Sequence, residues 1–349
     1  MRYVFLKLIL KKANEDFSVS YHRFFFFLAC RLAFTFRFAE KTMVNVKRRR
    51  RFIPGECNHV YQRTINGFVL FYDLEDFLVC YMIMSVVARK YKVSILEICF
   101  MIDHIHLLIV AETCEDLAAF LRDYTSVYVL EYNGAVGRKG QMFHKSFGSA
   151  PKKGEKKTRA TIVYVGNNPV EKKLCKRAEE YRWNFLKYMS AAESDSVRMP
   201  EIGISRALRR CMNLVKAFSK TNAYINYTLL RHLFEGLNDV EKESLTDYII
   251  KCYSPFKANG ISAYYENWEQ MMMAMHSTTG SEHDIKETFH AGSDKIYQDM
   301  IGYLKKEYKI NVVREVTVLP LDEKLRIADE LKKHTGATPY EIKKFLHVR

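Results

Sequence analysis

The stretch VSILEICFMIDHIHLLIV, residues 93–110, restricts the fold more than any other part of the chain. It holds two apolar runs, 95–102 and 105–110, and the break between them predicts two strands joined by a tight turn. Side chains alternate along a strand, so His104 and His106 share one face while Ile105 and Leu107 point to the opposite, apolar face. We therefore expect a sheet with an imidazole pair on one side and a hydrophobic core on the other.

The flanking segments extend this pattern. Residues 59–71 are rich in β-branched and aromatic side chains and predict a strand or a hairpin around Asn66-Gly67. Residues 74–91 and 115–132 carry apolar positions at helical spacing. The order strand, helix, strand, strand, helix is that of a ferredoxin-like split βαβ antiparallel sheet. The pattern is helical almost throughout after Ser190, so we predict an α+β fold followed by an all-α C-terminal domain.

The chain has 349 residues, a length for which two domains are the usual expectation. We predict an N-terminal extension over 1–42, dispensable or mis-assigned because Met43 is a credible start. The sheet domain then covers 43–190 and a helical domain covers 191–349. An apolar run beginning at Phe24 is short and is interrupted by Arg31, so it does not predict a membrane span. We expect no membrane partner and a cytoplasmic, nucleoid-associated location.

Charge and cysteine content indicate the environment and the class of partner. Lys and Arg number 55 against 40 Asp and Glu, a balance of +15, which favours a polyanionic partner. A hydrophobic content of 48% excludes a disordered chain. The eight cysteines occur singly, which predicts free thiols in a reducing compartment and argues against a zinc site.

Basic residues gather in two segments. One is the cluster 47–51, and the other is the glycine-rich stretch 134–159, where Phe143, His144 and Phe147 are interleaved with cations. Cations that follow phosphates and aromatic rings that stack on unpaired bases are typical of single-stranded nucleic acid binding. The residues predicted to contact phosphates are Arg48, Arg49, Arg50, Arg51, Arg138, Lys139, Lys145, Lys152, Lys153, Lys156, Lys157 and Arg159.

The histidine pair has two interpretations when taken alone. Two imidazoles side by side can chelate a divalent cation, and they can also lie on a polar sheet face without a ligand. If residues 160–170 are helical, Tyr164 and Asn168 lie one turn apart on one face, where both could face that cation. Pro169 disfavours helical geometry at Asn168, so we expect the helix to end or kink there.

Together these motifs resemble a known family. The first motif is His104-Ile105-His106 within a Met-x-Asp-His-x-His-Leu-Leu sequence, and the second is the segment from Tyr164 to Val170. A third, weaker similarity is the predicted first strand, His59 to Arg63. The sequence resembles the HUH single-tyrosine transposases, especially the REP-associated tyrosine transposases. This resemblance makes 43–190 an HUH catalytic domain.

The resemblance also implies a chemistry. His104, His106 and Asn168 would hold Mg²⁺ or Mn²⁺, and Tyr164 would attack the DNA backbone. The products would be a 5′-phosphotyrosine and a free 3′-OH, and the substrate single-stranded or hairpin-bearing DNA. Two alternatives stay open: a non-catalytic or domesticated DNA-binding protein that uses the sheet as a platform, and a replication-initiator-like nickase. A homodimer is also left open.

Other tyrosines and the C-terminus have structural interpretations. Tyr124, Tyr128 and Tyr132 recur every four residues, a spacing that favours packing over chemistry. Residues 320–347 predict two helices about a glycine turn, with Thr338 and Glu341 as a capping box. A helix-turn-helix tip carrying Lys343 and Lys344 and an ordinary helical hairpin are both compatible with this pattern.

Overall fold

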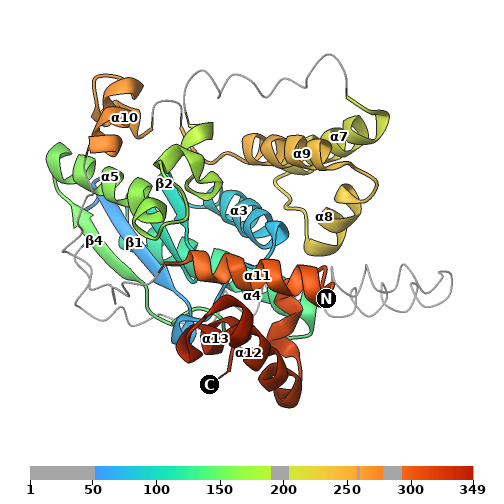
Figure 1. Cartoon of the computed structure of the whole chain (residues 1–349). Coiled ribbons are helices and arrows are strands. Elements are labelled where there is room, and N and C mark those ends of the chain that lie inside the picture. Colours follow the sequence, from blue (N-terminus) through green and yellow to red (C-terminus); the bar gives the residue numbers. More distant parts are fainter. Residues whose placement is uncertain (1–51, 190–203, 258–259, 278–292, 349) are drawn as a thin grey trace, which may run out of the picture. The chain divides into compact units, whose positions relative to one another are not determined.

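Four strands pair into one antiparallel sheet in the computed structural model, which describes residues 52–189, 204–257, 260–277 and 293–348 (Figure 1). Their order across the sheet is β2-β3-β1-β4. Along the chain the first elements are β1 (Cys57–Arg63), α3 (Leu74–Ala88), β2 (Val93–Phe100), β3 (His104–Ala111), α4 (Cys114–Val136), β4 (Gly148–Lys152) and α5 (Glu155–Glu171). This order of elements and strands confirms the predicted ferredoxin-like sheet.

The strand register places the histidines as predicted. β3 pairs antiparallel with β1, and Tyr61 lies opposite His106 while Arg63 lies opposite His104. The tight turn between β2 and β3 closes with a hydrogen bond from the Met101 amide to the His104 carbonyl at 2.9 Å. Directly opposed residues of an antiparallel pair share a face, so the two histidines, Tyr61 and Arg63 lie on the same side of the sheet.

The segment 59–71 differs from the prediction. The strand ends at Arg63, and a short 3₁₀ turn follows over Ile65–Gly67, in which Asn66 has a φ of 57°. No second strand of a hairpin returns along β1, because β3 and β4 already occupy its two edges. The chain from Phe68 instead bonds elsewhere, with the Leu70 amide donating to the Ile102 carbonyl at 2.7 Å.

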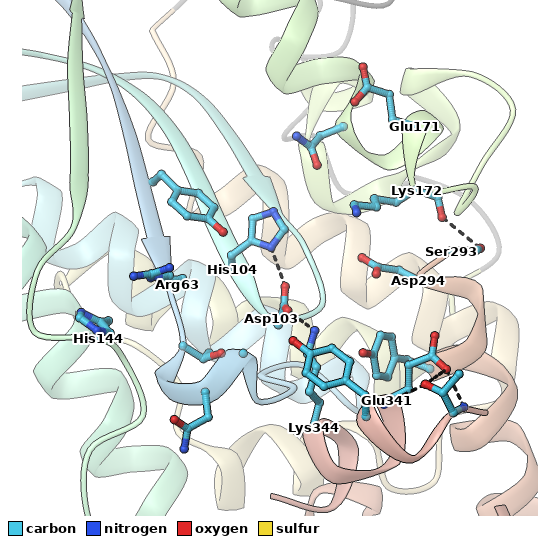
Figure 2. Close-up of a pocket in the computed structure, with 18 of the residues that line it drawn as sticks. Arg63, Asp103, His104, His144, Glu171, Lys172, Ser293, Asp294, Glu341 and Lys344 are labelled. Atoms are coloured by element: carbon cyan, nitrogen blue, oxygen red, sulfur yellow. Dashed lines mark hydrogen bonds and ion pairs between the residues drawn. The ribbon is translucent and has the colours of Figure 1, made fainter. Parts of the chain in front are cut away.

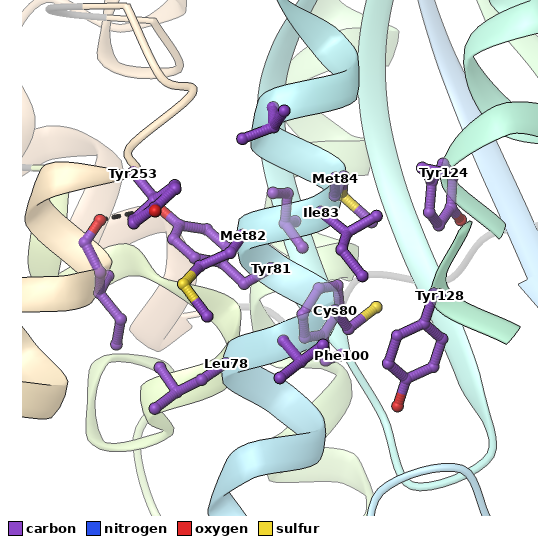
Figure 3. Close-up of a cluster of buried hydrophobic side chains, with 14 of the residues drawn as sticks. Leu78, Cys80, Tyr81, Met82, Ile83, Met84, Phe100, Tyr124, Tyr128 and Tyr253 are labelled. Carbon is purple, nitrogen blue, oxygen red and sulfur yellow. Dashed lines mark hydrogen bonds between the residues drawn. The ribbon is translucent and has the colours of Figure 1, made fainter. Parts of the chain in front are cut away.

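α3 and α4 cover the apolar face of the sheet (Figure 3). Ile105 and Leu107 of β3 are fully buried there, as their alternation predicted. Tyr124, Tyr128 and Tyr132 of α4 are each 0% exposed and belong to the same core, which confirms that this stripe is packing. α5 and α10 (Trp268–Ser277) cover the other face, where Ile162, Leu108 and Met275 share a second cluster.

The C-terminal helices are α7 (Arg206–Lys220), α8 (Tyr227–Phe234), α9 (Asp239–Cys252), α10, α11 (Lys295–Glu307), α12 (Leu321–Thr335) and α13 (Pro339–Leu346). Helices α7 to α9 bury Leu208, Leu230 and Ile249 in the core of α3 and α4. They therefore share that core rather than form one of their own, and all described residues fall within one compact unit, 51–349. The boundary at 190/191 stays a prediction, and the extension 1–42 lies outside the described residues.

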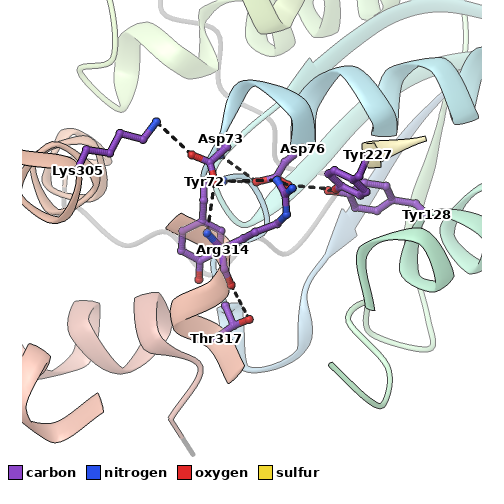
Figure 4. A network of polar contacts seen from close by, with 8 residues as sticks. All are labelled: Tyr72, Asp73, Asp76, Tyr128, Tyr227, Lys305, Arg314 and Thr317. Carbon is purple, nitrogen blue, oxygen red and sulfur yellow. Dashed lines mark hydrogen bonds and ion pairs between the residues drawn. The ribbon is translucent and has the colours of Figure 1, made fainter. Parts of the chain in front are cut away.

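A buried ion-pair network ties the C-terminal region to the start of α3 (Figure 4). Arg314 lies in the 3₁₀ helix η6 (Val313–Val318) and is fully buried. Its guanidinium donates to Asp76 at 2.9 Å and lies 4.2 Å from the ring centre of Tyr227. Asp76 also accepts hydrogen bonds from the amides of Tyr72 and Asp73 at the N-terminus of α3. A residue of the C-terminal half thus completes the cap of a helix in the sheet domain.

The prediction of free thiols is supported in the part of the chain that the structure describes, whereas the apolar run from Phe24 lies outside it. The seven cysteines there, Cys57, Cys80, Cys99, Cys114, Cys175, Cys211 and Cys252, are all free thiols. Among the same residues, no helix is long and apolar enough to cross a membrane.

Candidate active site

The histidines of β3 lie at one end of the sheet with both rings oriented by hydrogen bonds. Nδ1 of His104 lies 2.6 Å from Oδ1 of Asp103. Nδ1 of His106 lies 2.9 Å from Nε2 of His59, which projects from β1. Each ring is thus held through Nδ1, and Nε2 of His106 faces Asn168 of α5. This is the arrangement that proteins use for metal-binding histidines.

The buried histidine is suited to be a ligand. Burial lowers the pKa of His106 well below its ordinary value, and the neighbouring His104 and His59 lower it further. A neutral imidazole is the form that binds a cation. In the described residues no three His, Cys, Asp or Glu side chains gather as ligands, so a cation here would need an additional ligand of another type. The amide of Asn168 is placed to supply it.

α5 brings Tyr164 and Asn168 to the histidines. The ring centre of Tyr164 lies 5.8 Å from those of His106 and His59. Nδ2 of Asn168 lies 3.3 Å from Nε2 of His106, and turning the amide over would present its oxygen to the same position. The four residues predicted from the sequence as nucleophile and ligands are therefore neighbours in the fold.

Pro169 does not end the helix, contrary to the prediction. α5 continues to Glu171, and the amide of Lys172 donates to the Asn168 carbonyl at 3.1 Å. A proline in a helix lacks one backbone donor and crowds the carbonyl four residues before it, but α5 continues for two residues beyond Pro169. Asn168 therefore keeps helical geometry and stays one turn beyond Tyr164.

A cavity of about 760 Å³ opens beside these residues (Figure 2). Tyr164, Asn168, His104 and Arg63 line it from the sheet and α5, whereas His106 lies beneath them, fully buried. The opposite wall comes from the C-terminal region, with Asp294, Tyr297, Tyr340 and Lys344 among its residues. The helices that follow the sheet domain therefore contribute to the site.

Lys344 joins the two walls directly. Its Nζ lies 2.6 Å from Oδ2 of Asp103, the residue whose other oxygen contacts His104. The hydrogen bond to His104 and the positive charge of Lys344 outweigh burial and hold the pKa of Asp103 below its ordinary value. The predicted helical hairpin is present, and its Thr338 capping box is confirmed. Lys344 is nevertheless buried against Asp103, so it does not belong to an exposed DNA-binding tip.

The predicted basic loop is only partly a loop. Its second half forms β4 and the first turns of α5, because β4 pairs with the remaining edge of β1. Lys152 lies in β4 and is 2% exposed. It is therefore not part of an exposed DNA-binding surface, which corrects the prediction for this residue.

The other basic residues that were predicted to bind DNA differ in their contacts and exposure. The guanidinium of Arg138 donates to Oδ1 of Asn133 and to the carbonyls of Gly140 and Gln141, so it closes the loop after α4. Arg159 pairs with Glu155 at 2.8 Å on the surface of α5. Arg48, Arg49, Arg50 and Arg51 lie outside the described residues. The exposed predicted residues are Lys139, Lys145, Lys153, Lys156, Lys157 and Arg159.

Several residues of this site were not predicted from the sequence as site residues. His59 and Asp103 were visible within the quoted motifs, and the carboxylate next to His104 was the stronger signal for an orienting partner. Arg63 follows from the register of β1 against β3, which local periodicity does not provide. Tyr340 and Lys344 reach the cavity only through tertiary packing.

Comparison with known proteins supports the transposase resemblance. The family of IS200-like transposases matches residues 40–168, a segment that contains both histidines, Tyr164 and Asn168. This segment is similar to the IS200-like transposases. A solved structure of a REP-associated tyrosine transposase bound to a REP hairpin is similar at 18% identity and a TM-score of 0.34, covering 39% of this chain and 80% of the other. No curated protein matches the chain.

The IS200-like transposase segment ends at Asn168, the last of the four residues that the geometry brings together. The cavity wall formed by α11 and α13 lies beyond it. The matched segment therefore contains the four candidate residues, and the C-terminal half of the chain completes the cavity next to them.

Proposed function

We propose that the chain is a metal-dependent endonuclease and strand transferase that acts on single-stranded, hairpin-bearing DNA through Tyr164. The observation that carries this proposal is the convergence of Tyr164 and Asn168 on His106 within an IS200-like transposase segment. The exposed lysines around β4 and α5 and the +15 charge balance support a DNA partner.

The reaction is a displacement at phosphorus. The Tyr164 oxygen forms a bond to the phosphorus, and the bond from phosphorus to the 3′ oxygen breaks. The 5′ end stays on the tyrosine as a phosphodiester, and the other fragment leaves with a free 3′-OH. Because the tyrosyl ester retains the phosphodiester's free energy, a 3′-OH can attack it and rejoin a strand.

Other residues of the site would bind the metal ion or orient its ligands. His104, His106 and Asn168 would hold Mg²⁺ or Mn²⁺, an ion that would offset negative charge on the scissile phosphate when bound. Asp103 and His59 keep the two imidazoles oriented through Nδ1. Tyr164, which is 7% exposed, lines the cavity in which the scissile phosphate would lie.

The experiment that tests the function uses the full chain and a labelled pool of hairpin-bearing single strands with randomised flanks. With Mn²⁺ or Mg²⁺ we expect a DNA-linked protein band that survives denaturation, and with EDTA we expect none. Binding of the pool without such a band in either ion would refute the enzyme and favour the non-catalytic DNA-binding platform.

Loss of one ligand tests the cation site directly. His106→Ala should bind Mn²⁺ at least about tenfold more weakly, because an imidazole ligand is removed from a preorganised site. Titration calorimetry without DNA measures this change. His232→Ala, which removes an exposed histidine paired with Glu235 on the surface, is the control and should bind like the wild type. Equal affinities for all three proteins would remove His106 from the site.

The exposed lysines after β4 and in the first turn of α5 should contribute to the salt dependence of binding. The pair Lys153→Ala and Lys157→Ala should lower the slope of log affinity against log salt by about 1.4, at roughly 0.7 for each phosphate contact on a single strand. Lys332→Ala with Lys333→Ala removes the same charge from exposed positions of α12. If both pairs change the slope equally, the effect is one of net charge and not of a contact surface.

A further inference from the structure

One wall of the cavity beside Tyr164 is formed by residues that lie beyond the matched segment 40–168. α13 is fixed there by backbone and side-chain contacts: the Val69 amide donates to the Lys344 carbonyl at 3.2 Å, and Nε2 of His347 lies 2.8 Å from the Val69 carbonyl. The Lys344–Asp103 ion pair adds a contact to the catalytic strand. These contacts fix α13 in position, so the wall is a permanent part of the cavity.

This wall presents an aromatic surface. Tyr340 lies one turn before Lys344 on α13 and is 52% exposed although it lines a cavity. Nζ of Lys344 lies 5.6 Å from its ring centre and 5.4 Å from that of Tyr297, which is buried. A large exposed ring next to a cation is the combination on which unpaired bases stack.

The cavity also contains a cation that can contact an anion. Two of its acidic side chains are already engaged: Asp103 is paired with Lys344, and Glu341 accepts hydrogen bonds from the amide and hydroxyl of Thr338, both at 2.7 Å. Arg63 is exposed and lines the same space, so a guanidinium is available to a phosphate.

We propose that this cavity holds one unpaired nucleotide next to the scissile phosphate, with its base stacked on Tyr340 and its phosphate facing Arg63. This assignment rests on the proposed function of Tyr164. A volume of about 760 Å³ is in the range of small-molecule sites and accommodates a nucleotide. The C-terminal half of the chain thereby takes part in substrate selection at the cleavage point.

Binding of a short random-sequence single strand, with 5-iodouracil in place of thymine, tests the assignment. The chains carry Tyr164→Phe so that the strand is not consumed. Tyr340→Leu should weaken binding about tenfold, because one stacked base is lost, and Tyr340→Trp should retain it. Tyr308→Leu removes a comparably exposed tyrosine, 41% exposed, at the end of α11 and should bind like its parent. Irradiation should cross-link the strand at Tyr340.

The outcomes separate this proposal from the proposed function. Equal binding by Tyr340→Leu and its parent, or an equal loss in Tyr308→Leu, would overturn the nucleotide site even where the wild type forms the covalent adduct. A wild type that forms no adduct would refute the enzyme, and the loss in Tyr340→Leu with rescue by tryptophan would still support the nucleotide site. Melting temperatures of the variants verify that each is folded.

Discussion

A chain with Tyr164→Phe should bind single-stranded DNA like the wild type and form no covalent adduct. The ring stays in place between α5 and the histidines, so the packing of the second cluster is kept. Only the hydroxyl that would attack phosphorus is lost. Removing a nucleophile typically costs more than about a thousandfold in rate, which in a gel assay is the disappearance of the DNA-linked band.

Two matched variants show whether this loss is specific. Tyr128→Phe removes a hydroxyl from the α4 core, where it lies 3.5 Å from the Tyr227 hydroxyl, and should leave adduct formation intact. Tyr61→Phe removes a hydroxyl from the cavity itself and should do the same. Mass spectrometry of the wild-type adduct should locate the DNA on Tyr164. A linkage to Tyr61, or an adduct that persists in Tyr164→Phe, would disprove the assignment.

Replacing Arg314 by methionine should destabilise the fold by about 3–5 kcal/mol, because the carboxylate of Asp76 would remain buried without its ionic partner. Both side chains are 0% exposed, so water cannot substitute for the guanidinium. The N-terminus of α3 would lose part of its cap, and η6 would lose its contact with the sheet domain. Urea unfolding measures the change.

The control for this prediction is Arg326→Met, an exposed position on α12 that should change stability by less than about 0.5 kcal/mol. Adding Asp76→Asn to Arg314→Met should recover part of the loss, because the uncompensated charge is removed while an amide oxygen still caps the helix. If Arg314→Met is as stable as Arg326→Met, the ion pair of Arg314 with Asp76 contributes nothing measurable to the stability of the fold.

Most of the sheet could be predicted from local patterns, whereas the family resemblance singled out Tyr164 and Asn168. Alternation placed Ile105 and Leu107 in the core and both histidines on the opposite face, and helical spacing placed Tyr164 and Asn168 on one side of α5. These features follow from the repeat of side-chain direction along a strand or a helix, which a short stretch of sequence is enough to show. The helix through Pro169 was mispredicted because a proline in a last turn loses one hydrogen bond and the tertiary contacts of α5 outweigh it.

The basic residues show where composition fails. Lys152 and Lys157 lie in the same charged segment, yet the first is buried in β4 and the second is exposed on α5. Arg138, in the same segment, binds carbonyls of its own loop. Charge in the sequence indicates a polyanionic partner, but strand pairing and loop closure select which cations can reach it.

The sequence by itself determined the antiparallel sheet and the face of the histidine pair, because these follow from periodicities within about twenty residues. Only the tertiary structure decided that Lys344 lies against Asp103, across 241 positions of sequence, and that Tyr340 lines the cavity. Such contacts form where two packed surfaces meet, and no local pattern encodes which surfaces those are. The candidate residues of the sheet were therefore visible in the sequence, whereas the wall that faces them was not.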